Sequence, residues 1–433
     1  MNENLLQFIW QHKYLLENKL MSSQGKTIEV IKPGLLNRDS GPDFFNALIR
    51  IDNTKWAGNV EVHINSSDWR KHGHQNDAAY HNVILHLVWH HDEVILNQLN
   101  EEIPTLEMKH LVQTETLEKY KVLLLKKSII SCEPIFTLPD QEILWMWIER
   151  LSTERLEKKH LQIQTHLTYT TGHWEEVFFK QLAICFGQKT NANPFELLTA
   201  TLTWNLIQKY FHQHLSFQAI FIGVAGFLDH TLANNYNLTL QKEYAYLSKK
   251  HGLQKLDVLV WKFGKTRPAN FPTLRLVQFA ELVYSKPQFF QTVLSCKNYK
   301  ELLSLFELKS PQKIDIGDLH PKGKESHFES ISLSKQFIES ILINVAIPMV
   351  FSYGKYTQQD FLCNRAQEWL QQVPAESNHI ITRWRTLGIT CKKANETQAM
   401  IQLKNYYCDQ NKCLQCAIGN QILKPKKLSE LSS

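Results

Sequence analysis

Apolar and polar residues alternate along several short runs in the first third of the chain, which is the pattern of half-buried β-strands. The clearest runs are residues 46–51 (NALIRI) and 56–64 (WAGNVEVHI), and Asp52-Asn53 between them supplies the turn of a hairpin. Residues 82–89 (NVILHLVW) are almost wholly apolar and predict a largely buried strand. The other elements expected here are strands at 27–31, 93–96 and 105–108 and amphipathic helices at 4–20 and 117–130.

The pattern becomes helical beyond residue 139, for example in residues 145–166 and 240–251. A connector with prolines and glycines at residues 310–334 precedes a last helical section, which ends in a group of cysteines. The predicted fold class is an α/β domain with a mixed sheet, followed by a mainly α-helical region with a C-terminal cysteine cluster. The domain boundaries that these changes predict are 1–132, 139–308 and 309–433.

The composition is that of an ordinary globular protein, with 43% hydrophobic and 21% charged residues, so extensive disorder is not expected. The net charge of +6 is compatible with binding of nucleic acid but does not indicate it alone. No apolar run approaches the ~20 residues that span a bilayer, and the N-terminus lacks the plan of a secretory signal. We therefore expect a cytoplasmic protein without a membrane segment.

Histidine is concentrated in one stretch of the predicted sheet. Seven of the chain's 19 histidines lie between His63 and His91. Polar, metal-binding side chains are costly in strand-like sequence unless they are used. The functional site is therefore expected in this stretch.

Asp43, Glu61 and His63 are the leading candidates for catalytic residues. Glu61 and His63 are two apart in a predicted strand, so their side chains share a face. Pro42-Asp43 directly precedes the neighbouring strand, from which the Asp43 carboxylate can face Glu61. The alternative is that Pro42-Asp43 is an ordinary turn and that Glu61 and His63 form a solvent-facing pair.

His74 and His86 are candidates for additional metal ligands. Imidazole ligands would favour Mn²⁺, Zn²⁺ or iron over Mg²⁺. His86 lies in an apolar run, however, where a lone histidine is more often a hydrogen-bonded core residue.

Pro42-Asp43 followed by Glu61-Val62-His63 resembles the active-site signature of the restriction-endonuclease-like, or PD-(D/E)XK, nuclease superfamily. The resemblance implies that Asp43 and Glu61 hold Mg²⁺ or Mn²⁺ and that the next motif position activates the attacking water. That position holds His63 instead of the family's lysine, and a histidine can act as a general base or bind a softer metal. In some members an acidic residue of the leading helix reaches the site, which here suggests Gln11 or Glu17.

A second resemblance covers nearly the whole chain. The strings GPDFFNA, GNVEVHINSSDWRKHGH, RPANFPTLRLVQFA and CLQCAIG are similar to those of an uncharacterised bacterial family known only as a domain of unknown function. This resemblance implies that the predicted parts belong together, and it implies no biochemistry.

Three cysteines near the C-terminus, Cys408, Cys413 and Cys416, are spaced C-x4-C-x2-C. Cysteines this close in a cytosolic protein suggest a structural Zn²⁺ or iron–sulfur centre, and Cys391 is the expected fourth ligand. The alternative is a set of free buried thiols.

Arg267 and Arg275 flank the start of a predicted helix at residues 274–283, where backbone N–H groups also favour anions. The two arginines are therefore candidates for phosphate contacts with nucleic acid. The alternative is a buried loop anchored by Phe271, with the arginines paired to acidic neighbours.

The function expected from these observations is metal-dependent hydrolysis of phosphodiester bonds in DNA or RNA. Asp43 and Glu61 would bind Mg²⁺ or Mn²⁺, and His63 would orient or deprotonate the water. One alternative is a histidine-rich metal hydrolase of a small molecule, with His63, His74 and His86 around its pocket. The other is a non-catalytic nucleic-acid-binding protein that keeps a nuclease-like fold.

Overall fold

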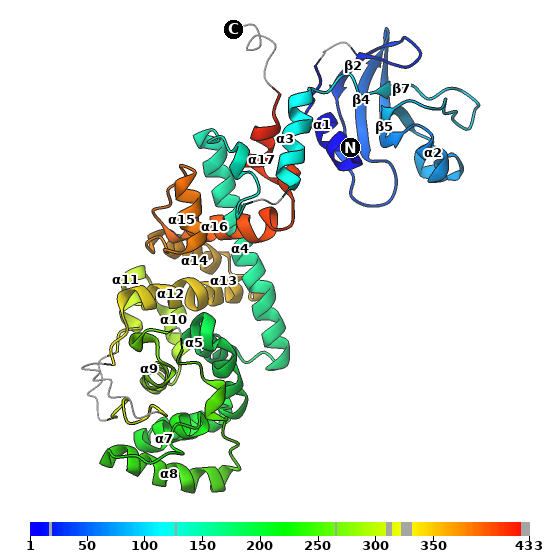
Figure 1. Ribbon diagram of the computed structural model, residues 1–433. Helices are drawn as coiled ribbons and strands as arrows, with labels where there is room; N and C mark the ends of the chain where they lie inside the picture. Colours follow the sequence, from blue (N-terminus) through cyan, green and yellow to red (C-terminus); the bar gives the residue numbers. More distant parts are fainter. Residues whose placement is uncertain (17–19, 126–127, 265, 309–313, 322–330, 426–433) are drawn as a thin grey trace. The chain divides into compact units, whose positions relative to one another are not determined.

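The computed structural model describes residues 1–16, 20–125, 128–264, 266–308, 314–321 and 331–425 (Figure 1). The chain forms two compact units. Unit 1 comprises the described parts of residues 1–147, 383–389 and 403–433, and unit 2 comprises those of residues 148–382 and 390–402. The boundaries predicted at 132 and 309 were inferred from changes of composition along the chain. Composition cannot reveal that the last segment packs back into unit 1, so the structure has two units where the sequence predicts three domains.

Unit 1 is built around a mixed β-sheet. The strand order is β1-β2-β4-β5-β6-β7, with β3 paired to β4. The pairs from β1 to β5 are antiparallel, whereas β5–β6 and β6–β7 are parallel. The strands are β1 (Leu20–Met21), β2 (Thr27–Lys32), β3 (Leu35–Leu36), β4 (Phe44–Ile51), β5 (Thr54–Asn65), β6 (Val83–His90) and β7 (Thr105–Glu107).

The central hairpin of this sheet is the one that the alternating pattern predicts. β4 and β5 pair up to the turn, where Ile51 lies opposite Thr54. Asp52 has a φ of 50°, a left-handed conformation that a short Asx side chain tolerates in a tight turn. The predicted buried strand is β6, which runs parallel to β5 and places His86 opposite Glu61. The mixed sheet followed by a mostly helical region is therefore confirmed.

Helix α1 (Glu3–Gln11) packs against β5 and begins with a side-chain cap. The Asn2 side chain accepts a hydrogen bond from the backbone N–H of Leu5 at 3.0 Å, which satisfies one of the free donors at the helix start. Its apolar face is buried, as the sequence predicts. The helix ends well before residue 20, because Lys13 adopts a left-handed φ of 53° that a helix cannot continue through.

Unit 1 also contains α2 (Asp68–Lys71), α3 (Thr114–Leu124) and α17 (Ala417–Leu423). α17 packs beside α3, so the last segment of the chain lies next to the segment that follows the sheet (Figure 1). The hydroxyl of Thr116 donates to the carbonyl oxygen of Leu423 across this contact.

Beyond residue 139 the described structure is mainly helical, as predicted. Its core is rich in aromatic rings: those of Phe179 and Phe279 stack at 5.3 Å, and Phe221 packs edge-on against both. About half of the predicted connector at 310–334 lies outside the described residues, namely 310–313 and 322–330. The helices are α4 (Gln141–Tyr169), α5 (Trp174–Thr201), α6 (Trp204–Ile207), α7 (His214–Val224), α8 (Asn235–His251), α9 (Pro272–Tyr284), α10 (Phe289–Ser295), α11 (Tyr299–Leu305), α12 (Lys335–Ile341), α13 (Ile347–Tyr356), α14 (Asp360–Gln372), α15 (His379–Thr386) and α16 (Ala394–Leu403).

The continuous helical stretch Lys335–Tyr356, which includes α12 and α13, is long and apolar enough to cross a membrane by length and composition. The sequence pattern does not single it out, because Ser340 and Asn344 interrupt the apolar run. In the structure 78% of its most apolar window is buried, as in the core helix of a folded unit.

Helices α7 and α8 approach each other closely at Gly223. A Cβ atom at this position would lie 2.1 Å from the ring of Tyr244. Because an interior at crystal-like density cannot absorb such an overlap, we expect Gly223→Ala to destabilise the protein by about 1–3 kcal/mol. Urea unfolding followed by circular dichroism measures the change. Gly264→Ala is the matched control, since nothing lies within 4 Å of its added methyl group. Equal stability of the two variants would contradict this packing.

Candidate metal centre

The candidate site begins on β5, which carries Glu61 and His63 on one face. Both side chains are buried, with 5% and 1% of their residue surface exposed. His86, on the parallel strand β6, lies behind His63, and its Nε2 is 2.8 Å from Nδ1 of His63. Glu61 and His63 therefore share one face of the strand, as expected. Because both are buried, they are not the solvent-facing pair that was the alternative.

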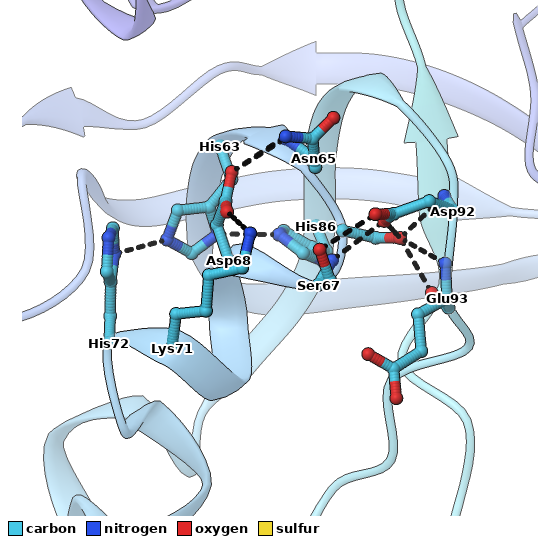
Figure 2. A network of polar contacts seen from close by, with 10 residues as sticks. His63, Asn65, Ser67, Asp68, Lys71, His72, His86, Asp92 and Glu93 are labelled. Atoms are coloured by element: carbon cyan, nitrogen blue, oxygen red, sulfur yellow. Dashed lines mark hydrogen bonds and ion pairs between the residues drawn. The ribbon is translucent and has the colours of Figure 1, made fainter.

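The segment after β5 turns back over the strand and brings two more histidines to His63. Asp68 at the start of α2 accepts a hydrogen bond from the backbone N–H of Asn65 at 2.9 Å, which fixes the turn (Figure 2). Gly73 follows the helix with a left-handed φ of 78°, a conformation that glycine adopts without strain. His72 and His74 flank this glycine, so the turn aims both imidazoles at the same place.

Three imidazoles converge there. The ligand atoms of His63, His72 and His74 all lie within 4.8 Å of one another. Nε2 of His63 is 3.1 Å from Nδ1 of His72. Figure 2 shows His63 between His72 on one side and His86 on the other. His63 is buried, His74 is half-buried and His72 is exposed, so the cluster opens to the surface at His72.

Glu61 completes this group with a carboxylate oxygen. Its Oε1 lies 3.3 Å from Nε2 of His74 and 3.6 Å from Nε2 of His63. Its other oxygen, Oε2, accepts a hydrogen bond from the backbone N–H of Asp43 at 3.0 Å. One oxygen of Glu61 is thus used to hold the Asp43 segment, and the other faces the imidazoles.

Asp43 is held beside Glu61 by a reciprocal contact. Its Oδ2 accepts a hydrogen bond from the backbone N–H of Val62 at 3.0 Å, and its Oδ1 accepts one from the side chain of Gln7 at 2.8 Å. Burial, followed by the charge of Glu61, raises the pKa of Asp43 to about 7 despite these two hydrogen bonds. Asp43 can therefore hold or release a proton near neutral pH.

Helix α1 contributes Glu3 and Gln7, which are four residues apart and share a face of the helix. Gln7 binds Asp43, and Glu3 is close enough to interact electrostatically with His72, Glu61 and His74. Burial raises the pKa of Glu3. The leading helix therefore reaches the site one or two turns earlier than the suggested Gln11, which is exposed, while the suggested Glu17 lies outside the described residues.

Burial keeps the central imidazoles neutral. Burial, followed by the neighbouring His74 and His72, lowers the pKa of His63 to about 3. Burial, followed by His63, also lowers the pKa of His86 far below its usual value. A neutral imidazole is the form that binds a metal. His63 is thus available as a ligand at any ordinary pH, but it is a poor proton acceptor, which disfavours the expected role of general base.

The residues fit a divalent cation. Ligands at about 2.1 Å from one ion are about 3.0–3.4 Å from each other. The spacings of 3.1, 3.3 and 3.6 Å are close to this range, whereas the ligand atoms of the three histidines lie up to 4.8 Å apart, so the imidazoles would draw closer around an ion. Nε2 of His74 is buried and forms no hydrogen bond within the described part of the chain, although it faces the Glu61 carboxylate. His86 reaches the group only through His63, in the position of an outer partner that orients a ligand.

The sequence analysis did not select His72 as a site residue. The sequence feature that could have indicated it is its position next to Gly73 and His74. His86, expected as a ligand, lies behind His63 because it stands on β6, the parallel neighbour of β5. His90, at the end of β6, pairs instead with Glu107 at 3.2 Å.

The two arginines proposed for nucleic acid differ in exposure. Arg267 is exposed, but Arg275 has only 5% of its surface accessible. Its guanidinium donates to the side-chain oxygens of Asn270 and Gln278 and stacks on the ring of Phe337 at 3.6 Å. Burial lowers the pKa of Arg275 to about 10. Arg275 is therefore held mainly by interior contacts, because α9 is buried along almost its whole length.

The fold and the site together define a two-unit protein with an N-terminal mixed sheet, a helical unit and a histidine–carboxylate cluster on the sheet. The chain belongs to the family described as "Protein of unknown function (DUF2851)", whose model matches residues 3–379. The whole-chain resemblance is confirmed over this range, and the string CLQCAIG lies beyond it. No curated protein and no solved structure matches the chain.

Proposed function

We propose that this protein is a metal-dependent hydrolase of phosphodiester bonds in DNA or RNA. The observation that carries the proposal is the cluster of His63, His72 and His74, with Oε1 of Glu61 facing His63 and His74 and with Asp43 hydrogen-bonded next to it. The order helix, strand, Pro-Asp, strand, Glu-x-His along the chain supports the nuclease class, as the motif resemblance implies.

The residues divide into three roles in this proposal. His63, His72, His74 and Glu61 hold the cation, and His86 fixes the orientation of His63 through its hydrogen bond. The bound ion would supply a Lewis acid for the scissile phosphate and a water of lowered pKa. Asp43, with a pKa near 7, accepts the proton of the attacking water. Gln7 keeps the Asp43 carboxylate in place.

The site favours a large substrate over a small enclosed one. His72 is exposed at the rim of the cluster, so a phosphate on a polymer can approach without entering a closed cavity. The net charge of +6 also favours an anionic partner. Among the two arginines proposed as phosphate contacts, Arg267 is the better candidate because it is exposed.

The donor set also revises the metal that we propose. Mg²⁺ prefers oxygen ligands with several bound waters, whereas imidazole suits Mn²⁺, Zn²⁺ and iron. With three imidazoles beside one carboxylate, Mn²⁺ or Zn²⁺ is a better match than Mg²⁺.

A cleavage assay tests the proposal. The full chain is incubated with single- and double-stranded DNA and RNA in EDTA, Mg²⁺, Mn²⁺ or Zn²⁺, in parallel with Asp43→Asn. We expect cleavage that requires an added metal, is stronger with Mn²⁺ or Zn²⁺ than with Mg²⁺, and is lost in the variant. Hydrolysis of small phosphate esters but of no polymer would favour the small-molecule hydrolase. Tight binding of nucleic acid without cleavage would favour the non-catalytic alternative.

The affinity for metal should fall with acidity. Because burial raises the pKa of Asp43 to about 7, a proton occupies this carboxyl below neutral pH and disfavours the cation beside it. Above that pKa the carboxylate is ionised and attracts the ion. One competing proton predicts an affinity up to about tenfold lower at pH 6 than at pH 8, and the full value applies if the cation displaces the proton completely. Calorimetric titration of Mn²⁺ at both pH values measures the ratio in wild type and in Asp43→Asn. The same ratio in the variant would exclude Asp43 as the group responsible.

A further inference from the structure

Four cysteines of unit 1 line one small cavity: Cys132, Cys408, Cys413 and Cys416. Three of them are the C-terminal group seen in the sequence. The fourth is Cys132, which lies at the end of the sheet-containing segment, 276 positions before Cys408 along the chain (408 − 132). Cys132 thus takes the place that the sequence predicts for Cys391, which belongs to unit 2 and whose thiol interacts with Glu396.

All four thiols are buried, with between 7% and 8% of each residue exposed. They occupy the ends of short helical segments: Cys132 precedes η3 (Glu133–Ile135), Cys408 ends η8 (Lys404–Cys408), and Cys413 begins η9 (Cys413–Gln415). Cys416 is the residue before α17.

The sulfur of Cys416 has hydrogen-bond donors. The backbone N–H groups of Gly419 and Ile418 donate to it. Donors directed at a buried sulfur are what a metal-bound thiolate would require.

We propose that Cys132, Cys408, Cys413 and Cys416 bind a metal centre through four thiolates. Four cysteine thiolates are a ligand set of structural Zn²⁺ and of iron–sulfur clusters. All eight cysteines of the chain are free of disulfides in the structure, so these sulfurs are available. The centre would hold no substrate.

The centre joins the first and the last of the three chain segments that make unit 1. The hydroxyl of Ser131 donates to the carbonyl oxygen of Cys408 at 3.1 Å, and Arg383 forms an ion pair with Glu133 beside the same segment. Unit 1 is interrupted by the whole of unit 2 in sequence, so closing it costs the entropy of a long loop. A metal that ties Cys132 to the last segment offsets that cost.

Metal analysis of the full chain purified without oxygen tests this proposal. The histidine cluster is removed with His72→Ala/His74→Ala so that metal at the two sites is counted separately. In this background we expect a stoichiometric centre, either one Zn²⁺ or an iron–sulfur cluster with its visible absorbance. Cys132→Ser should lose it, and Cys391→Ser, the matched control, should keep it.

A second measurement does not depend on the folding of a variant. Reconstitution of the metal-free chain with Co²⁺ should give the near-ultraviolet charge-transfer band of cobalt–thiolate bonds, and an organomercurial should abolish the band as it consumes four thiols. Absence of both native metal and the cobalt band, or equal metal content in Cys132→Ser and Cys391→Ser, would overturn the proposal. A failure of nuclease activity would leave it untouched, because the two sites share no residue.

Discussion

Replacing Glu61 by glutamine is expected to lower metal-dependent cleavage by about a thousandfold or more. Glu61 supplies the carboxylate that faces the imidazoles, and its second oxygen holds the backbone of Asp43. An amide keeps the shape of the side chain but loses the charge that attracts the cation. A metal contributes several kcal/mol to such a reaction, and each 1.36 kcal/mol is tenfold in rate. The measurement is the single-turnover rate of cleavage at saturating Mn²⁺.

The matched control is Glu107→Gln. Glu107 is also a sheet carboxylate paired with a histidine, His90, but that pair lies outside the cluster. We expect full activity in this variant. Activity of Glu61→Gln within threefold of wild type would remove the carboxylate from the mechanism.

The second large effect is on metal affinity. His72→Ala/His74→Ala should weaken Zn²⁺ binding by about ten-thousandfold or more, because an apparent Zn²⁺ binding energy of about 10–16 kcal/mol shared by four ligands gives each about a hundredfold or more. His72 is exposed, whereas the His74 ring stacks on Tyr80 at 3.8 Å, so circular dichroism first checks that the double variant keeps its fold. Competition against a fluorescent chelator measures the constant.

His90→Ala provides the comparison for this double variant. His90 belongs to the same histidine-rich stretch but binds Glu107 at the end of β6. Metal affinity should be unchanged in this variant. A comparable loss in both proteins would mean that the histidines act through stability instead of coordination.

Much of the sheet could be predicted from the sequence because its pattern is local. Alternation in 46–51 and 56–64 defines the hairpin β4–β5, and the apolar run at 82–89 defines β6. The end of α1 could not be predicted in this way. The apolar positions continue beyond Gln11, and only the left-handed backbone at Lys13 ends the helix.

The candidate site was predictable where its residues share one strand. The shared face of Glu61 and His63 follows from the two-residue period of side chains in a strand. The position of Asp43 follows from its place directly before the strand that pairs with theirs. His72 was missed because its place depends on the turn at Gly73, whose conformation has no periodic signature. His86 was assigned as a ligand because a histidine in an apolar strand has the same sequence signature whether it faces the site or lies behind a histidine that does.

Cys132 illustrates the same limit over a longer distance. Spacing in sequence favours Cys391 as the partner of the C-terminal cysteines, because it is the next one upstream. In the structure the last segment belongs to unit 1, and its three cysteines line the same cavity as Cys132. A contact made across an inserted unit leaves no trace in local spacing.

Locating the bound metal in a crystal tests the proposed site most directly. Crystals of the full chain grown with Mn²⁺ are measured at an energy where manganese scatters anomalously. We expect an anomalous peak about 2.1–2.2 Å from Nε2 of His63, Nδ1 of His72, Nε2 of His74 and Oε1 of Glu61. A fully occupied peak elsewhere, or none at these four atoms at saturating Mn²⁺, would contradict the proposed site.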